Sequence, residues 1–523
     1  MVVGAMDEPL RTTGTWRGWI VPLCFLLCGI VWWVSFRAVT GTTLEDAFIT
    51  YRYAQNLTLG QGFVFNAGQH VLGTTTPLLT MLLALIGKLV GTAAIPLAAT
   101  VSMICFGVLT ALATYGILSE LDLPQLTRAL SLIVFFGNEL LVVTCVGGME
   151  TPMVLFLMAA SAYSYLRNHP TPCLALCALL AIARPDGIVW GSVLFAALVL
   201  KTRSVPWKAV GIAIGVLLPW LAFSTWYFGS PLPHSITAKR LIAASHTCSL
   251  FTLGRFIEWY VRSTGYSGGS CMIGLWVVVL AIGGLSYVSP PRRRDFGVIL
   301  AAYALLYGAF LFLGRAPQFT WYLAPAAWCF VLVFTPGVCE LASFAAERLR
   351  PPVAPKIGAL LALCLVAVYL IHNRDVVAAN RENQANEWQT RRAIGLWLRD
   401  HTPPDAVVAM EAVGYQAYYS GRAVIDLAGL VSPAVVKLKL ASPSNADLFH
   451  DILSKLDPDY LVLRSFEVDE NRYYHGGKLF ETEAQRRYFE EKYQECKRFT
   501  APYPGRWKES AFLTIYGRRS RRP

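Results

Sequence analysis

Residues 19–36 read WIVPLCFLLCGIVWWVSF, a run of eighteen residues without a charge. A helix of this length can cross the hydrocarbon core of a bilayer. Arg11 and Arg17 precede the run and no small-residue cleavage site follows it. We therefore expect an uncleaved signal anchor with its N-terminus in the cytoplasm. The stretch predicts a helical membrane protein.

The composition of the whole chain agrees with that prediction. The chain has 523 residues, of which 55% are hydrophobic and 15% charged, and its mean hydropathy is +0.47. Soluble domains carry about 25% charged residues. This balance excludes a disordered chain, a small disulfide scaffold and an ordinary soluble enzyme. The net charge is +12, but Lys and Arg stand mostly between apolar runs, so we expect membrane lipid around the chain and no nucleic-acid partner.

Basic loops decide which apolar runs span the membrane. Further runs lie at 77–90, 94–118, 127–146, 150–166, 172–183, 186–200, 208–228, 270–288, 296–314, 321–340 and 356–372. Three basic clusters, within 201–208, 292–294 and 348–356, fall inside only if 77–90 lies along the interface. We therefore expect about 11 transmembrane helices in a bacterial inner (plasma) membrane, with the C-terminal part in the periplasm.

The last 150 residues differ from the rest. From about 373 the chain is polar with mixed charges, and 407–410, 423–427 and 460–463 have the pattern of short buried strands. Helical patterns lie near 383–401, 444–456 and 480–494. The expected fold class is thus a polytopic α-helical membrane protein. Its domains are a transmembrane domain at 1–372, with a first periplasmic loop at 38–93, and a soluble α/β domain at 373–523.

Two adjacent carboxylates, Glu45 and Asp46, follow the first span on its outer side. Charged groups at a membrane surface are costly to dehydrate, so they usually have a task or a partner. One interpretation is a general base or a metal ligand facing a cavity. The other is a helix cap, in which Glu45 or Asp46 stabilises the helix carrying Tyr51 and Arg52.

Other polar residues of the outer loops also allow two interpretations. Glu150 is either a second acid that binds sugar hydroxyls or a divalent ion, or a first-turn residue that complements a helix dipole. Arg184 either contacts a phosphate or forms a local salt bridge with Asp186.

The remaining basic candidates divide in the same way. His234, Lys239 and Arg240 either hold a phosphate or lie against lipid headgroups. Arg315 lies in an outer turn with aromatic residues, where an interfacial belt is the alternative to phosphate binding.

Several motifs in the outer loops resemble a known superfamily. They are 45–57 EDAFITYRYAQNL, 60–68 GQGFVFNAG and 71–80 VLGTTTPLLT, with later segments 147–152 GGMETP, 183–187 ARPDG and 229–240 GSPLPHSITAKR. Together they resemble the first periplasmic loop and later outer segments of bacterial GT-C glycosyltransferases. Arabinofuranosyltransferase B-like and related mannosyltransferase-like proteins are the nearest in pattern. Residues 414–433 resemble the family's C-terminal soluble domain.

The resemblance implies an inverting glycosyltransferase. Its donor would be a polyprenyl-phosphate-linked sugar, arabinofuranose or mannose, and its acceptor a cell-envelope glycan on the periplasmic face. The family's base is an Asp of this loop, and that role is carried to Asp46. The family commonly has Asp where this chain has Glu45, which leaves the role of Glu45 open.

A sugar linked through phosphate already has a good leaving group, so such a transfer needs a base and cations but no general acid. The expected substrate-binding residues are Glu45, Tyr51, Arg52, Glu150, Arg184, His234, Lys239, Arg240 and Arg315. A divalent cation (Mg²⁺, Mn²⁺ or Ca²⁺) between Asp46 and Glu150 is an open alternative.

Three other functions stay open. The same fold could glycosylate a protein or a lipid. The chain could be a transporter, although we expect no charged residue deep within a span and no matching pair of interrupted helices. It could also be a scaffold, in which case Asp46 would be dispensable.

Overall fold

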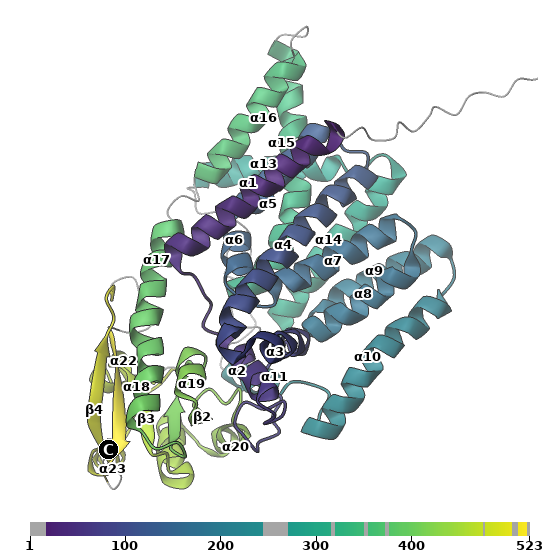
Figure 1. Cartoon of the computed structure of the whole chain (residues 1–523). Coiled ribbons are helices and arrows are strands. Elements are labelled where there is room, and N and C mark those ends of the chain that lie inside the picture. The colour runs from purple at the N-terminus through teal and green to yellow at the C-terminus, as the bar shows by residue number, and fades with distance from the viewer. Residues whose placement is uncertain are drawn as a thin grey trace, which may run out of the picture.

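The computed structural model describes residues 17–243, 270–314, 319–349, 354–371, 376–473, 476–504 and 511–519. A bundle of long helices forms most of this part of the molecule, and a β-sheet with its own helices lies at one end of the bundle (Figure 1). Arg315 lies outside the described residues, so its predicted role stays a prediction.

Apolar composition explains the helices of the bundle, most of which have no polar face. Its α-helices are α1 (Arg17–Thr40), α2 (Ala47–Thr58), α3 (Pro77–Val90), α4 (Ile95–Glu120), α5 (Gln125–Gly137), α6 (Glu139–Val146), α7 (Thr151–Leu166), α8 (Pro170–Ala183), α9 (Gly187–Thr202), α10 (Trp207–Phe228), α11 (His234–Ala243), α13 (Ser270–Leu285), α14 (Pro291–Leu313), α15 (Ala324–Leu349) and α16 (Ala354–Ile371). Short 3-10 helices, η1 (Thr92–Ala94) and η2 (Thr320–Leu323), precede α4 and α15.

Among the described residues, five helical segments are long and apolar enough to cross a membrane, and a bent pair brings the number to six. Five further apolar helices are shorter, with 10–17 residues each. These are the helices of a multi-pass membrane protein. The predicted number of about 11 spans stays a prediction.

The run at 127–146, which the sequence analysis treats as one span, is in fact two helices. Helix α5 ends at Gly137, α6 begins at Glu139, and the two axes meet at 61°. Asn138 stands between them, and its Oδ1 accepts a hydrogen bond from the backbone N–H of Leu141 and so caps α6. The expectation of no charged residue deep within a span stays a prediction, although Glu139 lies at this break between α5 and α6.

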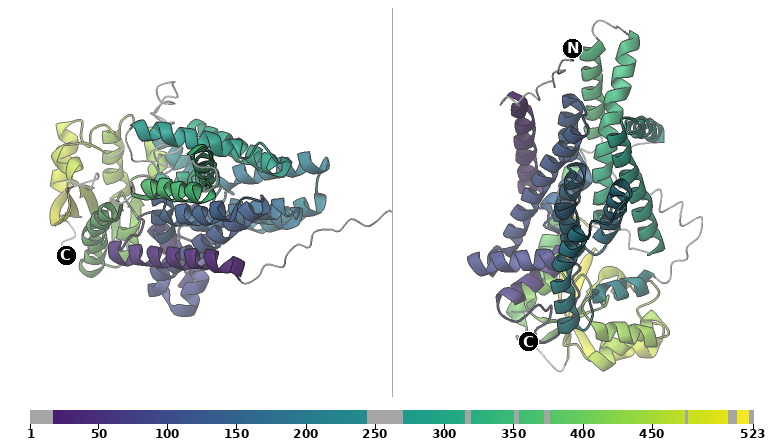
Figure 2. Two further views of the ribbon diagram at one scale, coloured as in Figure 1. Left: turned by 90° about the horizontal axis from the view of Figure 1, so that it is seen from above. Right: turned by 90° about the vertical axis from the view of Figure 1, so that its right-hand side faces the viewer.

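Helix α3 lies across the direction of the long helices (Figures 1 and 2). This orientation is compatible with an interfacial helix. The interfacial position of 77–90, which the basic loops predict, stays a prediction. Pro77 is in its first turn, and Gly91 follows its last residue with a positive φ of 95°.

The C-terminal part forms a five-stranded sheet with helices around it. Its strands are β1 (Val407–Met410), β2 (Ala423–Asp426), β3 (Tyr460–Arg464), β4 (Tyr493–Thr500) and β5 (Phe512–Arg518). Its helical segments are α17 (Val376–Asn386), the π-helix η4 (Glu387–Arg392), α18 (Ala393–His401), α19 (Tyr415–Ser420), α20 (Pro433–Ala441), α21 (Asn445–Asp451), the π-helix η5 (Ile452–Leu456), α22 (Ser465–Asp469) and α23 (Glu483–Lys492).

The strand order is β2-β1-β3-β5-β4. Strand β1 pairs in parallel with β2 and β3, placing Val408 opposite Val424 and Tyr460. Strand β5 pairs antiparallel with β3 and β4. The three strands predicted from sequence are present at their predicted positions. Strands β4 and β5 were not predicted.

The C-terminal sheet does not pack alone. One of its faces has a core of its own, built around Phe449, Leu461 and Tyr516. The other shares a core with the first outer loop, in which Tyr53 and Phe65 pack with Val408 and Ile515. The hydrophobic effect therefore holds the loop after α1 and the C-terminal sheet together as one packed unit.

Candidate active site

The loop that carries Glu45 and Asp46 is held by residues from distant parts of the chain. The backbone N–H of Leu44 donates to the carbonyl oxygen of Gly147 at 3.0 Å. That of Thr43 donates to Oε1 of Gln384 at 2.9 Å, and the Thr43 and Tyr415 hydroxyls form a short hydrogen bond. These contacts fix the loop just before α2 begins at Ala47.

The two adjacent carboxylates have different surroundings. Asp46 is the residue before α2, yet its side chain accepts no capping hydrogen bond. Glu45 accepts a hydrogen bond from the backbone N–H of Gly414. Burial raises the pKa of Glu45 to about 8, although Arg391 nearby acts against that rise. Capping of α2 by Asp46 therefore does not account for its position, which favours the other interpretation of that residue.

Lys239 of α11 is close enough to Asp46 to interact with it electrostatically, and an aromatic residue holds it. Its Nζ donates to the Tyr322 hydroxyl at 3.2 Å. Burial alone would lower the pKa of Lys239, but Tyr322, Asp46 and Glu150 raise it above its ordinary value. The lysine therefore stays charged and presents a cation next to the Asp46 carboxylate.

Arg184 forms the local salt bridge with Asp186 that was one of its two interpretations. Its Nε and Nη2 donate to the two carboxylate oxygens of Asp186 at 2.7 and 2.8 Å, and the pair is buried. The Tyr307 hydroxyl donates to Asp186 Oδ2 at 2.7 Å. Bidentate pairs of this kind fix the plane of the guanidinium, so the remaining nitrogen, Nη1, has a defined direction.

That nitrogen faces Glu150. Arg184 Nη1 lies 3.6 Å from Glu150 Oε1 and, within the described part of the chain, has no hydrogen-bond partner. Burial raises the pKa of Glu150, and Arg184 opposes that rise. Among the residues that the structure describes, the Thr151 hydroxyl beside Glu150 and the Ser235 hydroxyl, one turn from Lys239, are also buried without a partner. A site with several unsatisfied buried polar groups is suited to a polar ligand.

The structure thus brings Asp46, Glu150, Arg184 and Lys239 together. For Tyr322, in the outer turn after Arg315, the sequence allows either an interfacial-belt role or a role in substrate binding. Sequence reasoning did not place Tyr307 in this site, because it lies within a predicted apolar run.

Other predicted residues lie elsewhere. Arg52 is buried, and its three guanidinium nitrogens donate hydrogen bonds to the carbonyl oxygens of Phe65, Ala417 and Arg422. Tyr51 is buried and donates to the carbonyl oxygen of Gly148 at 3.0 Å. These contacts give both side chains packing roles in holding the loop, which accounts for them without a substrate.

His234 and Arg240 lie at the two sides of the segment that carries Lys239. The backbone N–H of His234 donates to Leu72 O at 2.7 Å, and its ring Nε2 is buried without a partner among the described residues. Burial lowers the pKa of His234, against the effect of Gly429. Arg240 is exposed.

The described residues contain no group of three or more His, Cys, Asp or Glu side chains that could hold a metal ion. Glu150, one of the two predicted ligands, instead faces the Arg184 guanidinium. The predicted divalent cation between Asp46 and Glu150 stays a prediction. No step below uses a metal.

Comparison with known proteins places the fold. A family described as a domain of unknown function (DUF8728) matches residues 378–516. No curated protein matches the chain. A crystal structure of ArnT from Cupriavidus metallidurans bound to undecaprenyl phosphate is similar over 96% of this chain and 98% of that one, with a TM-score of 0.59 and 11% identity. The apo ArnT structure has the same coverage, with a TM-score of 0.57 and 9% identity.

An oligosaccharyltransferase from Archaeoglobus fulgidus is also similar, over 87% of this chain and 71% of that one, with a TM-score of 0.55 and 11% identity. ArnT and this oligosaccharyltransferase are GT-C glycosyltransferases, so the chain has a GT-C fold. The arabinofuranosyltransferase B-like subtype gains no support from these neighbours.

Proposed function

We propose that the protein is an inverting membrane glycosyltransferase whose donor is a polyprenyl-phosphate-linked sugar. One observation carries this proposal: Asp46 has no capping bond and lies beside a charged lysine, Lys239, in a cluster that includes the fixed guanidinium of Arg184. The fold adds support, because similar folds occur in glycosyltransferases and one such protein, ArnT, is seen with undecaprenyl phosphate.

In the proposed reaction Asp46 accepts the proton of an acceptor hydroxyl. The acceptor oxygen forms a bond to the anomeric carbon while the bond from that carbon to the phosphate oxygen breaks. Lys239 and Arg184 Nη1 stabilise the negative charge that develops on the departing lipid phosphate. Displacement from the side opposite the phosphate inverts the anomeric configuration. The proton ends on Asp46 and the electron pair on the phosphate.

We also propose arabinofuranose or mannose as the sugar and a cell-envelope glycan on the periplasmic face as the acceptor. Both rest on the motifs of the first outer loop rather than on contacts in the cluster. The neighbouring alternative, with a protein or lipid acceptor, uses the same residues and differs only in the second substrate.

The experiment compares Asp46→Asn with the unchanged protein in detergent. Short-chain polyprenyl-phosphate sugars serve as donors, with and without EDTA, and product formation is followed by mass spectrometry. Loss of the general base lowers kcat by about 10²–10⁴-fold. Asp400→Asn is the control, because Asp400 is exposed and pairs only with its neighbour Arg399 in the described structure.

Equal turnover by Asp46→Asn and the unchanged protein would contradict the assignment of the base. If the unchanged protein turns over no donor of the panel, the glycosyltransferase proposal is contradicted and a transporter or scaffold becomes the better interpretation. EDTA should leave the rate unchanged if the two cations suffice to hold the phosphate.

A further inference from the structure

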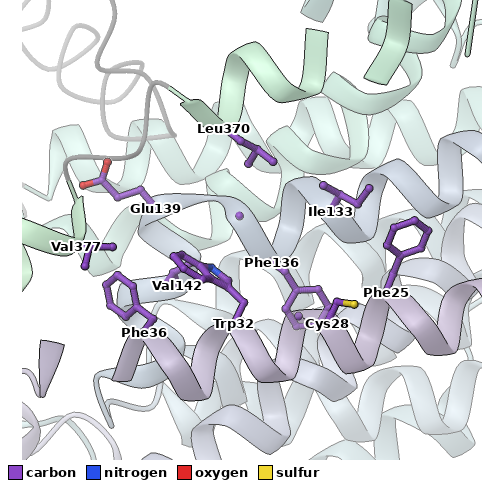
Figure 3. Close-up of a pocket in the computed structure, with 12 residues that line it drawn as sticks. Phe25, Cys28, Trp32, Phe36, Ile133, Phe136, Glu139, Val142, Leu370 and Val377 are labelled. Carbon is purple, nitrogen blue, oxygen red and sulfur yellow. The ribbon is translucent and has the colours of Figure 1, made fainter. Parts of the chain in front are cut away.

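An apolar cavity of about 480 Å³ lies between α1, α5, α6 and α16, away from the cluster around Asp46 (Figure 3). Phe25, Cys28 and Trp32 of α1 form one wall, and Ile133 and Leu370 lie opposite. Trp32 is 43% exposed, so the cavity opens on the outside of the helix bundle. Its size falls within the range of ligand pockets, about 300–1,000 Å³. We call it the α1 cavity.

One carboxylate, that of Glu139, lines the α1 cavity. Asn138 already caps α6, so Glu139 is not needed for that task. Glu139 has no hydrogen bond or ion pair with any residue that the structure describes. In Figure 3 its carboxylate lies at the end of the cavity marked by Phe36 and Val377. An acidic side chain at membrane depth is expensive, and such residues usually serve a ligand.

The end of the cavity that holds Glu139 is also the end that leads to the candidate active site. Helix α1 ends at Thr40, six residues before Asp46, and α6 runs from Glu139 to Val146, four residues before Glu150. The eight residues of α6 span about 12 Å. If a molecule lies in the cavity with its polar end at Glu139, the part of it that extends beyond Glu139 is therefore directed toward the loop of Asp46.

We propose that the α1 cavity holds the hydrocarbon chain of a lipid-anchored acceptor, with hydroxyl or amide groups of that lipid donating to Glu139. This inference rests on the proposed function and adds the class of the acceptor. Charge argues against the donor as the occupant: a lipid phosphate at the cavity end would meet the Glu139 carboxylate, whereas Lys239 and Arg184 offer it cations elsewhere.

The test uses the full-length protein in nanodiscs with two photoreactive probes, a diazirine-bearing sixteen-carbon alcohol and the matching alkyl phosphate. Labelled peptides are identified by mass spectrometry. We expect the alcohol to label the peptides that contain Phe25–Phe36 and Ile133–Val142. Glu139→Leu should reduce this labelling about tenfold, the effect of losing one hydrogen bond to a charged group.

Two matched substitutions on α1 test the cavity itself. Cys28 lines it, whereas Cys24, one turn earlier and also exposed, does not. Cys28→Phe fills the space and should abolish labelling by the alcohol, and Cys24→Phe should leave it unchanged. Retention of helical circular dichroism by both variants checks folding.

Three results would overturn the proposal. Equal labelling in Cys28→Phe would mean that the chain does not enter the cavity. Equal labelling by the alcohol and the phosphate, insensitive to Glu139→Leu, would mean an ordinary bilayer lipid. Preferred labelling by the alkyl phosphate would mean the donor. None of these readings depends on turnover, so failure of the glycosyltransferase assignment at Asp46 is detected separately.

Discussion

At the residue scale, the contacts of Glu45 and Asp46 assign different tasks to two adjacent carboxylates. Glu45 accepts a hydrogen bond from the backbone N–H of Gly414. In the described part of the chain, Asp46 makes no side-chain capping bond to α2 and interacts electrostatically with Lys239. The sequence motif alone could not separate these roles, because both residues stand at the start of the same helix. The position of Gly414, 369 residues further along the chain, makes the distinction.

Glu45 should make stability depend on pH. Its folded-state pKa, about 8, lies above the ordinary value of 4.5, so the folded protein holds a proton that the unfolded chain releases. The stabilising effect is complete below about pH 4.5 and is lost as the pH rises through 8. We expect the melting temperature to fall between pH 6 and about 9 in the unchanged protein.

Glu45→Gln keeps a side-chain oxygen for the Gly414 N–H but cannot titrate. Its melting temperature, followed by differential scanning fluorimetry in detergent, should decline less over the same range. An identical decline in both proteins would show that Glu45 is not the titrating group.

At the element scale, the packing of the C-terminal part against the first outer loop demands close backbone approach. A Cβ atom built on Gly414 lies 2.1 Å from the carbonyl oxygen of Glu45, and one on Gly73 lies 2.5 Å from a methyl group of Val431. The contact at Gly414 is with backbone, so rotating a side chain cannot relieve it and the two segments would have to separate.

We therefore expect Gly414→Ala to destabilise the protein by about 1–3 kcal/mol, as overpacking does, and to lower turnover by displacing Asp46. Thermal unfolding and the transfer assay measure the two effects. Gly215→Ala is the matched control, since nothing lies within 4 Å of a Cβ at that helical position. Unchanged turnover in Gly414→Ala would show that the C-terminal part does not position the catalytic loop.

The elements differ in how well the sequence predicts them. Strands β1 and β3 are nearly continuous apolar runs and were predicted correctly, since parallel strands are buried on both faces. Strand β4 reads YQECKRFT and is half exposed, so it lacks the apolar pattern of a buried strand. The predicted helix near 480–494 overlaps only its first two residues, and no element was predicted for the rest. The break at Asn138 was missed because one Asn hardly changes the hydropathy of a long apolar run.

At the scale of the whole molecule, the sequence predicts which residues form the candidate site but not how the fold brings them together. The sequence identified Asp46, Glu150, Arg184 and Lys239 because charged residues next to apolar runs are conspicuous. The sequence could not show that α7, α9, α11 and η2 bring these four residues together. Nor could it show that the guanidinium of Arg52 donates its hydrogen bonds to backbone carbonyl oxygens. Such facts depend on packing between segments that are distant in sequence.

The predicted topology gives a prediction for the entire chain. Gln61 and Glu470, both exposed, should lie on the outer side, and exposed Lys208 on the inner side. Single cysteines at these positions in intact cells should react with a membrane-impermeant maleimide at 61 and 470 but not at 208. Full detergent permeabilisation controls for reactivity. Labelling at 208 alone would show that the predicted orientation is reversed and that Asp46 lies in the cytosol.

The hydrogen bonds of Arg52 also have a consequence for biogenesis. Its guanidinium reaches carbonyl oxygens that lie 365 and 370 residues later in the chain, at Ala417 and Arg422. The ribosome makes those residues only when most of the protein has already been inserted. Phe65 O can accept from Nε of Arg52 early in synthesis, but the two terminal nitrogens find their acceptors only after residue 422 has been made. The segment that bears Asp46 therefore reaches its final hydrogen bonding late in translation.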